Sequence, residues 1–371
     1  MQRGFGFIIT GMNTILMWFI AISAVLGGLD KILGNRFGLG EKFDEGFRLI
    51  GPLIAGMAGI LCFTPMLAEV LQFSLAPFFR RFGLDPAILA GILPIDMGGY
   101  QLAAEMAADP KAGAFSGVFI AATFGCTLIF TIPVGFGLMK EENRPDFITG
   151  ILYGLIILPL PLLMGGLFCG LGFTETLRQS LPILILALIL GLGIWKNPRV
   201  MAGVFLFFAK VIQAISITGI VLGLVTYLTG QTILPNTMPL EEALHSAVLC
   251  GILLIGCMPF AELLNRILHR PLKRIGQVLG LEEKGITGML LSIVAVTPAL
   301  GLMHSMKKKD IVINAAFLVS AAAVFGPHLS VCAANQPALV TGMVVAKLFS
   351  GICSAAFSAL ILKKQENSAD L

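Results

Sequence analysis

The carboxylate of Asp96 lies in the middle of an apolar stretch, 87–100, where a charged side chain is costly. Insertion of a charge at membrane depth costs about 2.5–3.5 kcal/mol, so such a group normally faces a cavity, a partner or an ion path. Pro94 and the pair Gly98-Gly99 weaken a helix there, which is tolerated where the freed backbone groups line protein or water. The pattern predicts a polar site at the bilayer midplane that meets a small cation.

A structural ion pair inside the membrane is the alternative role for Asp96. Lys210 and Lys347 both lie well inside apolar stretches and are available as partners. A lysine at such a position either contacts a substrate or ion, or uses its long stem to reach the interface or a freed carbonyl. Both interpretations stay open at this point.

A second group of polar side chains lies between Gly326 and Pro337. Pro327 follows Gly326 directly, so the segment predicts a second discontinuous helix, whose freed carbonyls can accept hydrogen bonds from an ammonium group. A histidine such as His328 could titrate near neutral pH and then relay a proton or act as a gate, and a buried histidine with satisfied hydrogen bonds is an equal alternative. Asn335 is the better candidate for substrate contact, because an amide can satisfy a hydroxyl group.

Three glutamates lie closer to the ends of apolar stretches. Glu69 and Glu262 occupy similar sequence contexts, which suggests either interfacial caps or a gate at the cytoplasmic mouth. Glu105 follows Asp96 by nine residues, or about 13 Å along a helix, and is expected in a vestibule.

Composition places the chain among integral membrane proteins. Hydrophobic residues make up 57%, charged residues 12%, and the mean hydropathy is +0.92, whereas soluble domains carry roughly 25% charge. The net charge of +4 gives no reason to expect nucleic acid. The 7 cysteines lie in apolar stretches without Cys-x-x-Cys spacing, so neither a metal site nor a disulfide framework is expected.

The apolar stretches predict an all-α polytopic membrane protein with about 10–11 transmembrane helices in a single domain, 1–371. The expected spans are 5–28, 48–76, 86–107, 113–138, 147–173, 180–195, 200–229, 243–268, 285–305, 311–330 and 335–362. The segment 180–195 is short, and a re-entrant element is its alternative. If all of these cross, the lysines and arginines of the loops mildly favour a cytoplasmic N-terminus. Small-residue faces permit a homodimer.

Two parts of the chain, approximately 43–175 and 240–364, resemble each other and are joined by 176–239. The segments 67–71 and 260–264 share an Ala-Glu pair and are followed by a proline, a basic cluster and a Gly-Leu-acid step. Duplicated halves with broken helices in corresponding positions indicate the central site of a transporter. The sequence therefore predicts two related halves with broken helices at the midplane, either in the same orientation or inverted.

Motifs of common enzymes are missing from the sequence. It contains no His-Glu-x-x-His, no Gly-x-Ser-x-Gly, no P-loop and no Gly-x-Gly-x-x-Gly fingerprint. We therefore expect no catalytic residues, no cofactor and no ATP-driven pumping, which leaves a carrier or facilitator.

Five motifs, taken in order, resemble the EutH-type ethanolamine permease family. They are Phe43-Asp-Glu-Gly-Phe47, Asp96-Met-Gly-Gly-Tyr100, Phe208-Ala-Lys210, Lys309-Asp-Ile-Val-Ile-Asn-Ala-Ala-Phe317 and Gly326-Pro-His-Leu-Ser-Val-Cys-Ala-Ala-Asn335. The chain departs from the family pattern at Pro327, where the family has an acid, and at Tyr100, where it has Phe. Any role of that acid in coupling or selectivity is therefore in doubt for this chain.

The resemblance implies uptake of ethanolamine across the bacterial cytoplasmic membrane, by alternating access or facilitated diffusion. Ethanolamine is mostly a primary ammonium at neutral pH, with a hydroxyl two carbons away. We expect Asp96 to be the counter-ion of the ammonium and Asn335 the partner of the hydroxyl. Further substrate-binding candidates are Gln101, Thr297, His328 and, through its ring face, Tyr100.

Other functions stay open on the sequence alone. A carrier for another small amine, or for a cation such as Na⁺, has the same requirements. A membrane receptor or structural subunit that binds an amine without moving it is a different class. The expected partners are a small cationic amine and membrane lipids, and no nucleic acid.

Overall fold

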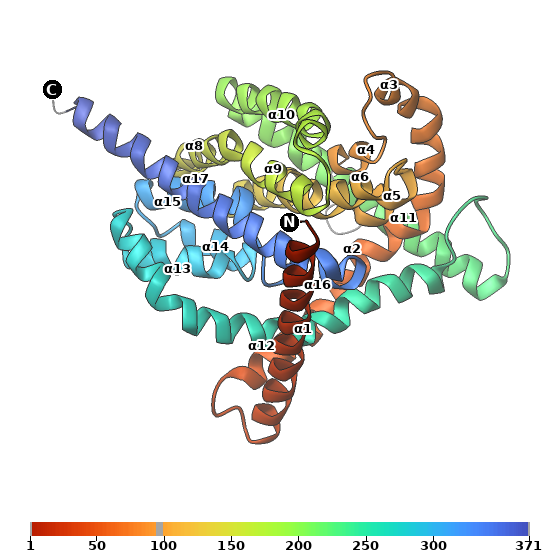
Figure 1. Cartoon of the computed structure of the whole chain (residues 1–371), viewed down its shortest axis with the longest axis horizontal. Coiled ribbons are helices and arrows are strands. Elements are labelled where there is room, and N and C mark those ends of the chain that lie inside the picture. Colours follow the sequence, from red (N-terminus) through yellow and green to blue (C-terminus); the bar gives the residue numbers. More distant parts are fainter. Residues whose placement is uncertain (1, 94–98, 370–371) are drawn as a thin grey trace.

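The computed structural model describes residues 2–93 and 99–369, with side chains described outside 2–10, 198–199, 202 and 366–369. Every regular element in this part of the chain is helical (Figure 1). The helices up to the middle of the chain are α1 (Gln2–Ile32), α2 (Leu39–Ser74), α3 (Ala76–Arg81), α4 (Ile88–Ile92), α5 (Gly99–Met106), α6 (Pro110–Ala114), the π-helices η1 (Phe115–Gly125) and η2 (Thr127–Thr131), α7 (Ile132–Leu138), the 3₁₀ turn η3 (Glu141–Asn143), α8 (Arg144–Ile157), α9 (Pro159–Phe168) and α10 (Phe173–Lys196). The others are α11 (Pro198–Thr229), α12 (Leu240–Val278), α13 (Glu283–Ser292), α14 (Val296–Met303), α15 (Lys308–Ala321), α16 (Pro327–Asn335), the 3₁₀ turn η4 (Pro337–Leu339) and α17 (Val340–Ala369).

The helical, multi-pass membrane architecture is confirmed. Within the described residues, 7 helical segments are long and apolar enough to cross a bilayer: Gly11–Ile32, Leu39–Ser74, Pro110–Leu138, Phe173–Lys196, Gly203–Thr229, Leu240–Val278 and Pro337–Gln365. A bent pair, Glu141–Ile157 and Pro159–Phe168, meets at 41° and brings the number to 8 if it counts as one span. The segment 180–195 belongs to α10, which is long enough to cross.

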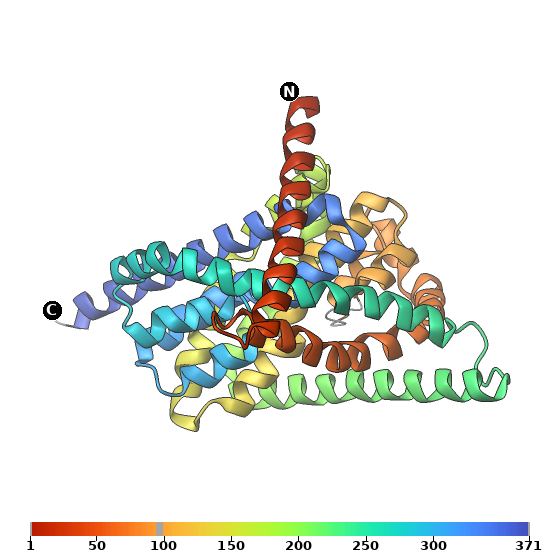
Figure 2. The ribbon, with the colours of Figure 1, turned by 90° about the horizontal axis from the view of Figure 1, so that it is seen from below.

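The most extensive contact between two helices in the described part of the chain is that of α2 and α12, which run antiparallel. Gly46 packs on Ile255, where an added Cβ would lie 2.7 Å from the Ile255 Cα. Further along α2, the Cys62 carbonyl accepts a hydrogen bond of 2.9 Å from the Met238 backbone N–H, just before α12. Residue numbers therefore rise along α2 as they fall along α12. Figure 2 shows α2 between α12 and α11.

The segment expected to span at 86–107 consists of two short helices, α4 and α5, which we call the first hairpin. The Asp85 carboxylate, one turn before α4, accepts hydrogen bonds from the backbone N–H groups of Ala108 (3.1 Å) and Asp109 (2.9 Å), just after α5. The two arms therefore begin and end at the same edge of the molecule. A buried carboxylate satisfied by backbone donors fastens this edge.

The segment expected at 285–305 is likewise two helices, α13 and α14, which we call the second hairpin. The carboxylate of Asp310, at the start of α15, accepts from the Glu282 N–H at 3.4 Å, directly before α13. Lys284 Nζ donates to the Ser305 carbonyl at 3.3 Å. This hairpin also returns to its starting edge. The span expected at 311–330 is broken as well, since α15 ends at Ala321 and α16 begins at Pro327.

The antiparallel course of α2 and α12 changes where the basic clusters lie. Eleven crossings would put Arg80-Arg81 and Lys273-Arg274 on one side of the membrane. In the structure, the first cluster ends α3, just after α2, and the second lies near the end of α12. Because these two helices run in opposite directions, the clusters lie at opposite edges.

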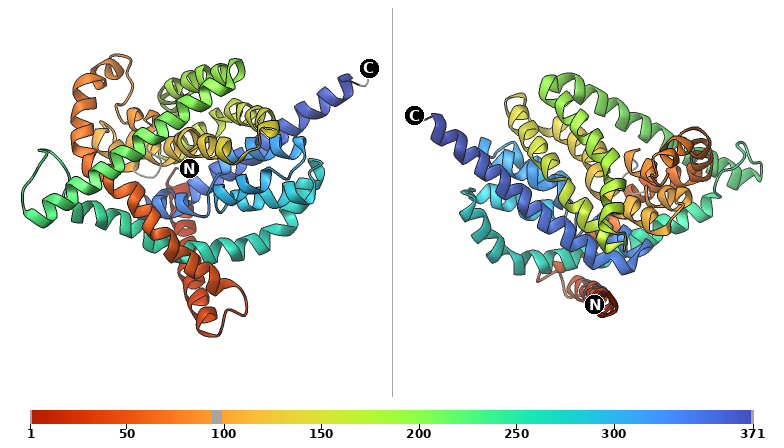
Figure 3. Two further views of the ribbon diagram at one scale, coloured as in Figure 1. Left: turned by 180° about the vertical axis from the view of Figure 1, so that it is seen from behind. Right: turned by 45° about the horizontal axis from the view of Figure 1, so that its top comes forward.

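A large apolar core surrounds the π-helical segment η1 and joins it to α8, α15 and α17. Its largest fully buried side chains include Phe115, Phe119, Phe147 and Phe317. Figure 3 shows α17 running over α8 and α9, which covers this core from one side. The rigid packing of η1 is relevant to function, because η1 forms one wall of the candidate site.

Candidate functional site

Four polar side chains from two distant parts of the sequence, three of them predicted site residues, meet where α5 begins and α16 ends. Gln101 Nε2 donates to Asn335 Oδ1 at 3.0 Å, and Gln336 Nε2 donates to the hydroxyl of Tyr100 at 2.7 Å. Asn335 Nδ2 donates to the Val331 carbonyl at 2.8 Å, within α16. We call Tyr100, Gln101, Asn335 and Gln336 the polar quartet; Gln336 is the member that was not among the predicted site residues.

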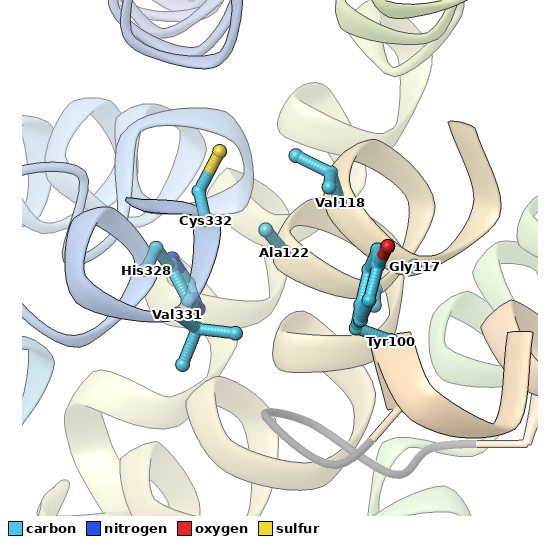
Figure 4. Close-up of a pocket in the computed structure, with 8 residues that line it drawn as sticks. Tyr100, Gly117, Val118, Ala122, His328, Val331 and Cys332 are labelled. Atoms are coloured by element: carbon cyan, nitrogen blue, oxygen red, sulfur yellow. The ribbon is translucent and has the colours of Figure 1, made fainter. Parts of the chain in front are cut away.

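A small cavity, the inner cavity, adjoins the quartet at Tyr100 (Figure 4). Its volume is about 20 Å³, which is room for little more than one water molecule. In Figure 4, His328, Val331 and Cys332 of α16 face Tyr100, Gly117 and Val118. The other lining residues are Ala121 and Ala122.

Gly117 lets the Tyr100 ring lie directly against η1. A Cβ at position 117 would lie 2.7 Å from the Tyr100 Cα and 2.8 Å from its ring Cδ2. Contacts this short force the ring to move, because ordinary van der Waals separations between carbon atoms are about 3.5–4.0 Å. A glycine at this place on η1 therefore sets the position of the first hairpin against the cavity.

The break between α15 and α16 is held by the second hairpin. The backbone N–H groups of Ala323 and Phe325 donate to the Ser292 and Ile293 carbonyls, each at 2.8 Å. Gly326 approaches the carbonyl of Val294 so closely that any Cβ would clash with it. The backbone groups freed by the break are thus satisfied within the protein, as membrane depth demands.

His328, on the first turn of α16, is buried with 6% of its surface exposed. Its Nδ1 lies 2.8 Å from the Ala322 carbonyl oxygen, so this nitrogen carries the proton and donates. His328 also lines a second cavity of about 400 Å³, with Thr297 and mostly apolar residues of α2, η2 and α14. The imidazole therefore lies at the boundary between two cavities, while Thr297 belongs to the larger one.

Asp96, the residue predicted as counter-ion, lies outside the described residues. Its described neighbours in the chain are Leu93, which follows α4, and Gly99, which begins α5. A Cβ on Gly99 would lie 3.5 Å from the Ala121 side chain, which lines the inner cavity.

The two glutamates expected near a membrane face and a vestibule lie together. Glu69 and Glu105 both line an open groove of about 600 Å³, with Gln72 and Asn236. Asn236 Nδ2 donates to the Glu69 carboxylate. We call this the acidic groove. Glu262, expected like Glu69 as an interfacial cap or a gate, lies elsewhere, in an ion pair of 2.7 Å with Arg266.

The two intramembrane lysines have different surroundings. Lys210 is exposed on α11. Lys347 of α17 is buried with 1% exposed, and its ammonium donates to the Ala122 carbonyl within the π-helical segment η1. Since Ala122 lines the inner cavity, Lys347 stands directly behind the cavity wall.

Sequence reasoning missed the cavity wall itself. Gly117, Val118, Ala121 and Ala122 are small apolar residues in a span full of such residues, and they carry no chemical signal. Within the described residues, no group of three or more His, Cys, Asp or Glu side chains is arranged to hold a metal ion.

Comparison with known proteins gives relatives over nearly the whole chain. The family described as "Ethanolamine utilisation protein, EutH" matches residues 12–361. The probable ethanolamine permease EutH of Listeria monocytogenes is 35% identical, with 93% of each chain covered. YxeR of Bacillus subtilis, an uncharacterized protein, is 35% identical over 95% of this chain and 96% of its own. The probable ethanolamine permease EutH of Escherichia coli is 30% identical over 97% and 98%.

No solved structure matches the chain. The family match and the relatives at 30–35% identity nevertheless extend across almost all of its length. The chain belongs to the EutH family of ethanolamine utilisation proteins.

Proposed function

We propose that the protein is a carrier that takes up ethanolamine across the bacterial cytoplasmic membrane, and is not an enzyme. The names of its relatives support a permease for this substrate. The observation that carries the proposal is the polar quartet, because four uncharged hydrogen-bonding side chains meet in a largely apolar membrane protein and one of them, Tyr100, lines the inner cavity.

The quartet has the hydrogen-bonding groups that ethanolamine needs. An ammonium offers three donors, and a hydroxyl both donates and accepts. Asn335 Oδ1 and the Tyr100 hydroxyl are acceptors, and no donor among the described residues reaches the buried Oε1 of Gln101. A bound molecule would replace hydrogen bonds within the quartet, each worth a net of about 0.5–1.5 kcal/mol. The resulting affinity is modest, as release of the substrate requires.

Asp96 supplies the negative charge in this proposal. It precedes Tyr100 and Gln101 by four and five positions in the sequence. A carboxylate strengthens hydrogen bonds to an ammonium group because the bond is charge-assisted. Neutral amides alone would bind the hydroxyl and leave the charge of the ammonium uncompensated in the membrane.

A carrier accounts for the inner cavity better than an open pore does. The cavity of about 20 Å³ is too small for a molecule of four heavy atoms. Ethanolamine therefore enters only when α5 and α16 move apart, which breaks the contacts Gln101–Asn335 and Tyr100–Gln336. Binding and opening are then coupled, which is the basis of alternating access.

Uptake of labelled ethanolamine into proteoliposomes tests the proposal, with wild type compared with Asp96→Asn and with Glu283→Gln, an exposed carboxylate at the start of α13. We expect uptake by the wild type and by Glu283→Gln, and loss of at least tenfold in Asp96→Asn at equal amounts of folded protein. Binding without accumulation would indicate a receptor, and exclusive uptake of another amine or of Na⁺ would change the substrate. Either result would contradict the proposal.

A further inference from the structure

The path of the chain across the membrane follows from the two hairpins. Neither of them crosses, because each returns to the edge where it begins. The crossing segments are then α1, α2, 110–138, α8 with α9, α10, α11, α12, α15 with α16, and α17. α15 begins beside Glu282, and after α16 the Ala338 carbonyl accepts from Asn13 of α1 at 2.6 Å, at the other edge.

The first helix of each half packs on a helix of the other half. Gly59 of α2 packs tightly on the backbone of Ser216 in α11. Gly256 of α12 packs on Ile20 in α1, where an added Cβ would lie 2.8 Å from the side chain. The two glycines are 197 positions apart. Thus α11 lies on α2 in the way that α1 lies on α12.

Each hairpin is held by the helix that follows it, through the same contact. Ser116 Oγ donates to the Ala87 carbonyl at 2.7 Å, and Asn314 Nδ2 donates to the Gly285 carbonyl at 3.0 Å. Both donors are fully buried. The two donors, and likewise the two acceptors, are 198 positions apart. Ser116 and Asn314 are therefore equivalent residues that fix the first arm of their hairpin.

The turns that lead into the hairpins also correspond. Gly83 and Gly280 have φ of 68° and 72°, a conformation that glycine adopts without steric cost, and they are 197 positions apart. The helices before these turns, α2 and α12, run in opposite directions. Corresponding parts of the two halves therefore point to opposite sides of the membrane.

We propose that residues 2–168 and 198–369 are two copies of one fold in inverted orientation, joined by α10 as a single crossing, and that the edge of the second hairpin is cytoplasmic. Because α10 crosses the membrane once between the two copies, the second copy has the opposite orientation. This inference depends on contacts and chain direction, and it holds whatever substrate the protein carries.

The positive charges decide which edge faces the cytoplasm. Of the 25 lysines and arginines, those at the edge of the first hairpin are Arg3, Arg80, Arg81, Lys111 and Arg178. Lys210 and Lys347 lie within crossings, and all the others lie at the edge of the second hairpin. Short loops rich in Lys and Arg stay in the cytoplasm. The N-terminus is then outside and the C-terminus inside.

This orientation replaces the cytoplasmic N-terminus expected from eleven crossings. That expectation counted both hairpins as spans and so mixed loops from the two edges. In the new arrangement the acidic groove with Glu69 and Glu105 opens to the outside, the side from which a cation is taken up.

Labelling of single added cysteines tests the arrangement. Ala108 and Ser305 are exposed, follow the first and second hairpin, and are 197 positions apart. We would make Ala108→Cys and Ser305→Cys, treat intact cells with a membrane-impermeant maleimide, and repeat the labelling after permeabilisation. The unmodified protein is the control, since its described cysteines are buried or partly buried.

We expect Ala108→Cys to react in intact cells and Ser305→Cys to react only after permeabilisation. Reaction of both from the same side would overturn the inverted arrangement, and the reverse pattern would overturn the orientation. A fluorescent protein that folds only in the cytoplasm, fused after Leu371, gives an independent readout. Fluorescence supports a cytoplasmic C-terminus, and dark but membrane-inserted fusions contradict it.

Discussion

The first and second hairpins have the same course and different chemistry. Both return to their starting edge, and both are held by a buried side chain of the following helix, Ser116 or Asn314. The first hairpin presents Tyr100 and Gln101 to polar partners at the end of α16. The second is tied to the break before α16 by backbone hydrogen bonds, and its Thr297 faces a largely apolar cavity.

This difference distinguishes contacts that support the fold from contacts that a ligand can replace. Backbone contacts such as Ala323 to Ser292 satisfy groups that the break would otherwise leave unpaired, so they are needed for the fold. Side-chain contacts such as Gln101 to Asn335 can be exchanged for contacts to a ligand at little cost. We infer that the second hairpin fixes α16 and that the first hairpin and α16 bind ethanolamine between them.

Replacing Gly326 by alanine should have the largest effect, because the new Cβ would clash with the Val294 carbonyl of the second hairpin. Backbone contacts cannot yield as a flexible side chain does, so we expect loss of most folded protein and of uptake. Gly301→Ala in α14 is the matched control, since nothing lies within 4 Å of its Cβ position. That change should be neutral or stabilise the helix by about 0.5–1 kcal/mol. Equal behaviour of both variants in size-exclusion yield and uptake would contradict the role of the second hairpin.

Lys347→Met should reduce uptake at least tenfold, because it removes the donor to the Ala122 carbonyl behind the inner cavity. Loss of a charged partner of a buried group typically costs more than about 1.5 kcal/mol, or a factor of more than ten. Lys210→Met on the exposed face of α11 serves as the control and should retain wild-type uptake. Initial rates at equal protein amounts measure both, and a stronger defect in Lys210→Met would refute this assignment.

Gln101→Ala should raise the KM for ethanolamine about fivefold, the equivalent of about 1 kcal/mol for one hydrogen bond. The residue has a neutral side chain, and its loss leaves Asn335 able to bond to the ligand, so Vmax should change little. A fall in Vmax with unchanged KM would show that the contact in the quartet controls movement and not binding.

Tyr100→Phe should have the smallest effect, about twofold in KM. The change removes the hydroxyl that accepts from Gln336 and keeps the ring against Gly117. The family pattern noted above has Phe at this position, which agrees with a tolerated loss. A rise in KM of tenfold or more would contradict this prediction, because it would show that the hydroxyl contributes more to binding than one net hydrogen bond of about 1 kcal/mol.

Local sequence signals predicted the helix breaks but not the return of the hairpins. Pro94 with Gly98-Gly99, and Gly326 with Pro327, mark weak points whatever the tertiary structure is. An apolar stretch such as 86–107 has the length of one crossing and equally of two short arms. The return depends on Asp85 reaching Ala108, a contact that hydropathy does not encode.

Residue type indicated which side chains are candidates for the site, but not which of them contact each other. Amides and a tyrosine within apolar stretches stand out in any sequence, so Gln101, Asn335 and Tyr100 were among the predicted site residues. Gln101 and Asn335 are 234 positions apart, and nothing in their local sequence pairs them. The proposed orientation of the N-terminus differs from the expected one for a related reason, since each hairpin that is counted as a span reverses all the loops after it.

Equilibrium binding of labelled ethanolamine to purified protein, compared between Asn335→Ala and Thr297→Ala, tests the central claim most directly. Asn335→Ala removes the amide that contacts the first hairpin, and Thr297→Ala removes a hydroxyl of the second hairpin that lines the larger cavity. We predict that Asn335→Ala raises Kd at least tenfold and that Thr297→Ala leaves it within twofold of wild type. Weakened binding in Thr297→Ala together with unchanged binding in Asn335→Ala would contradict a site between the first hairpin and α16.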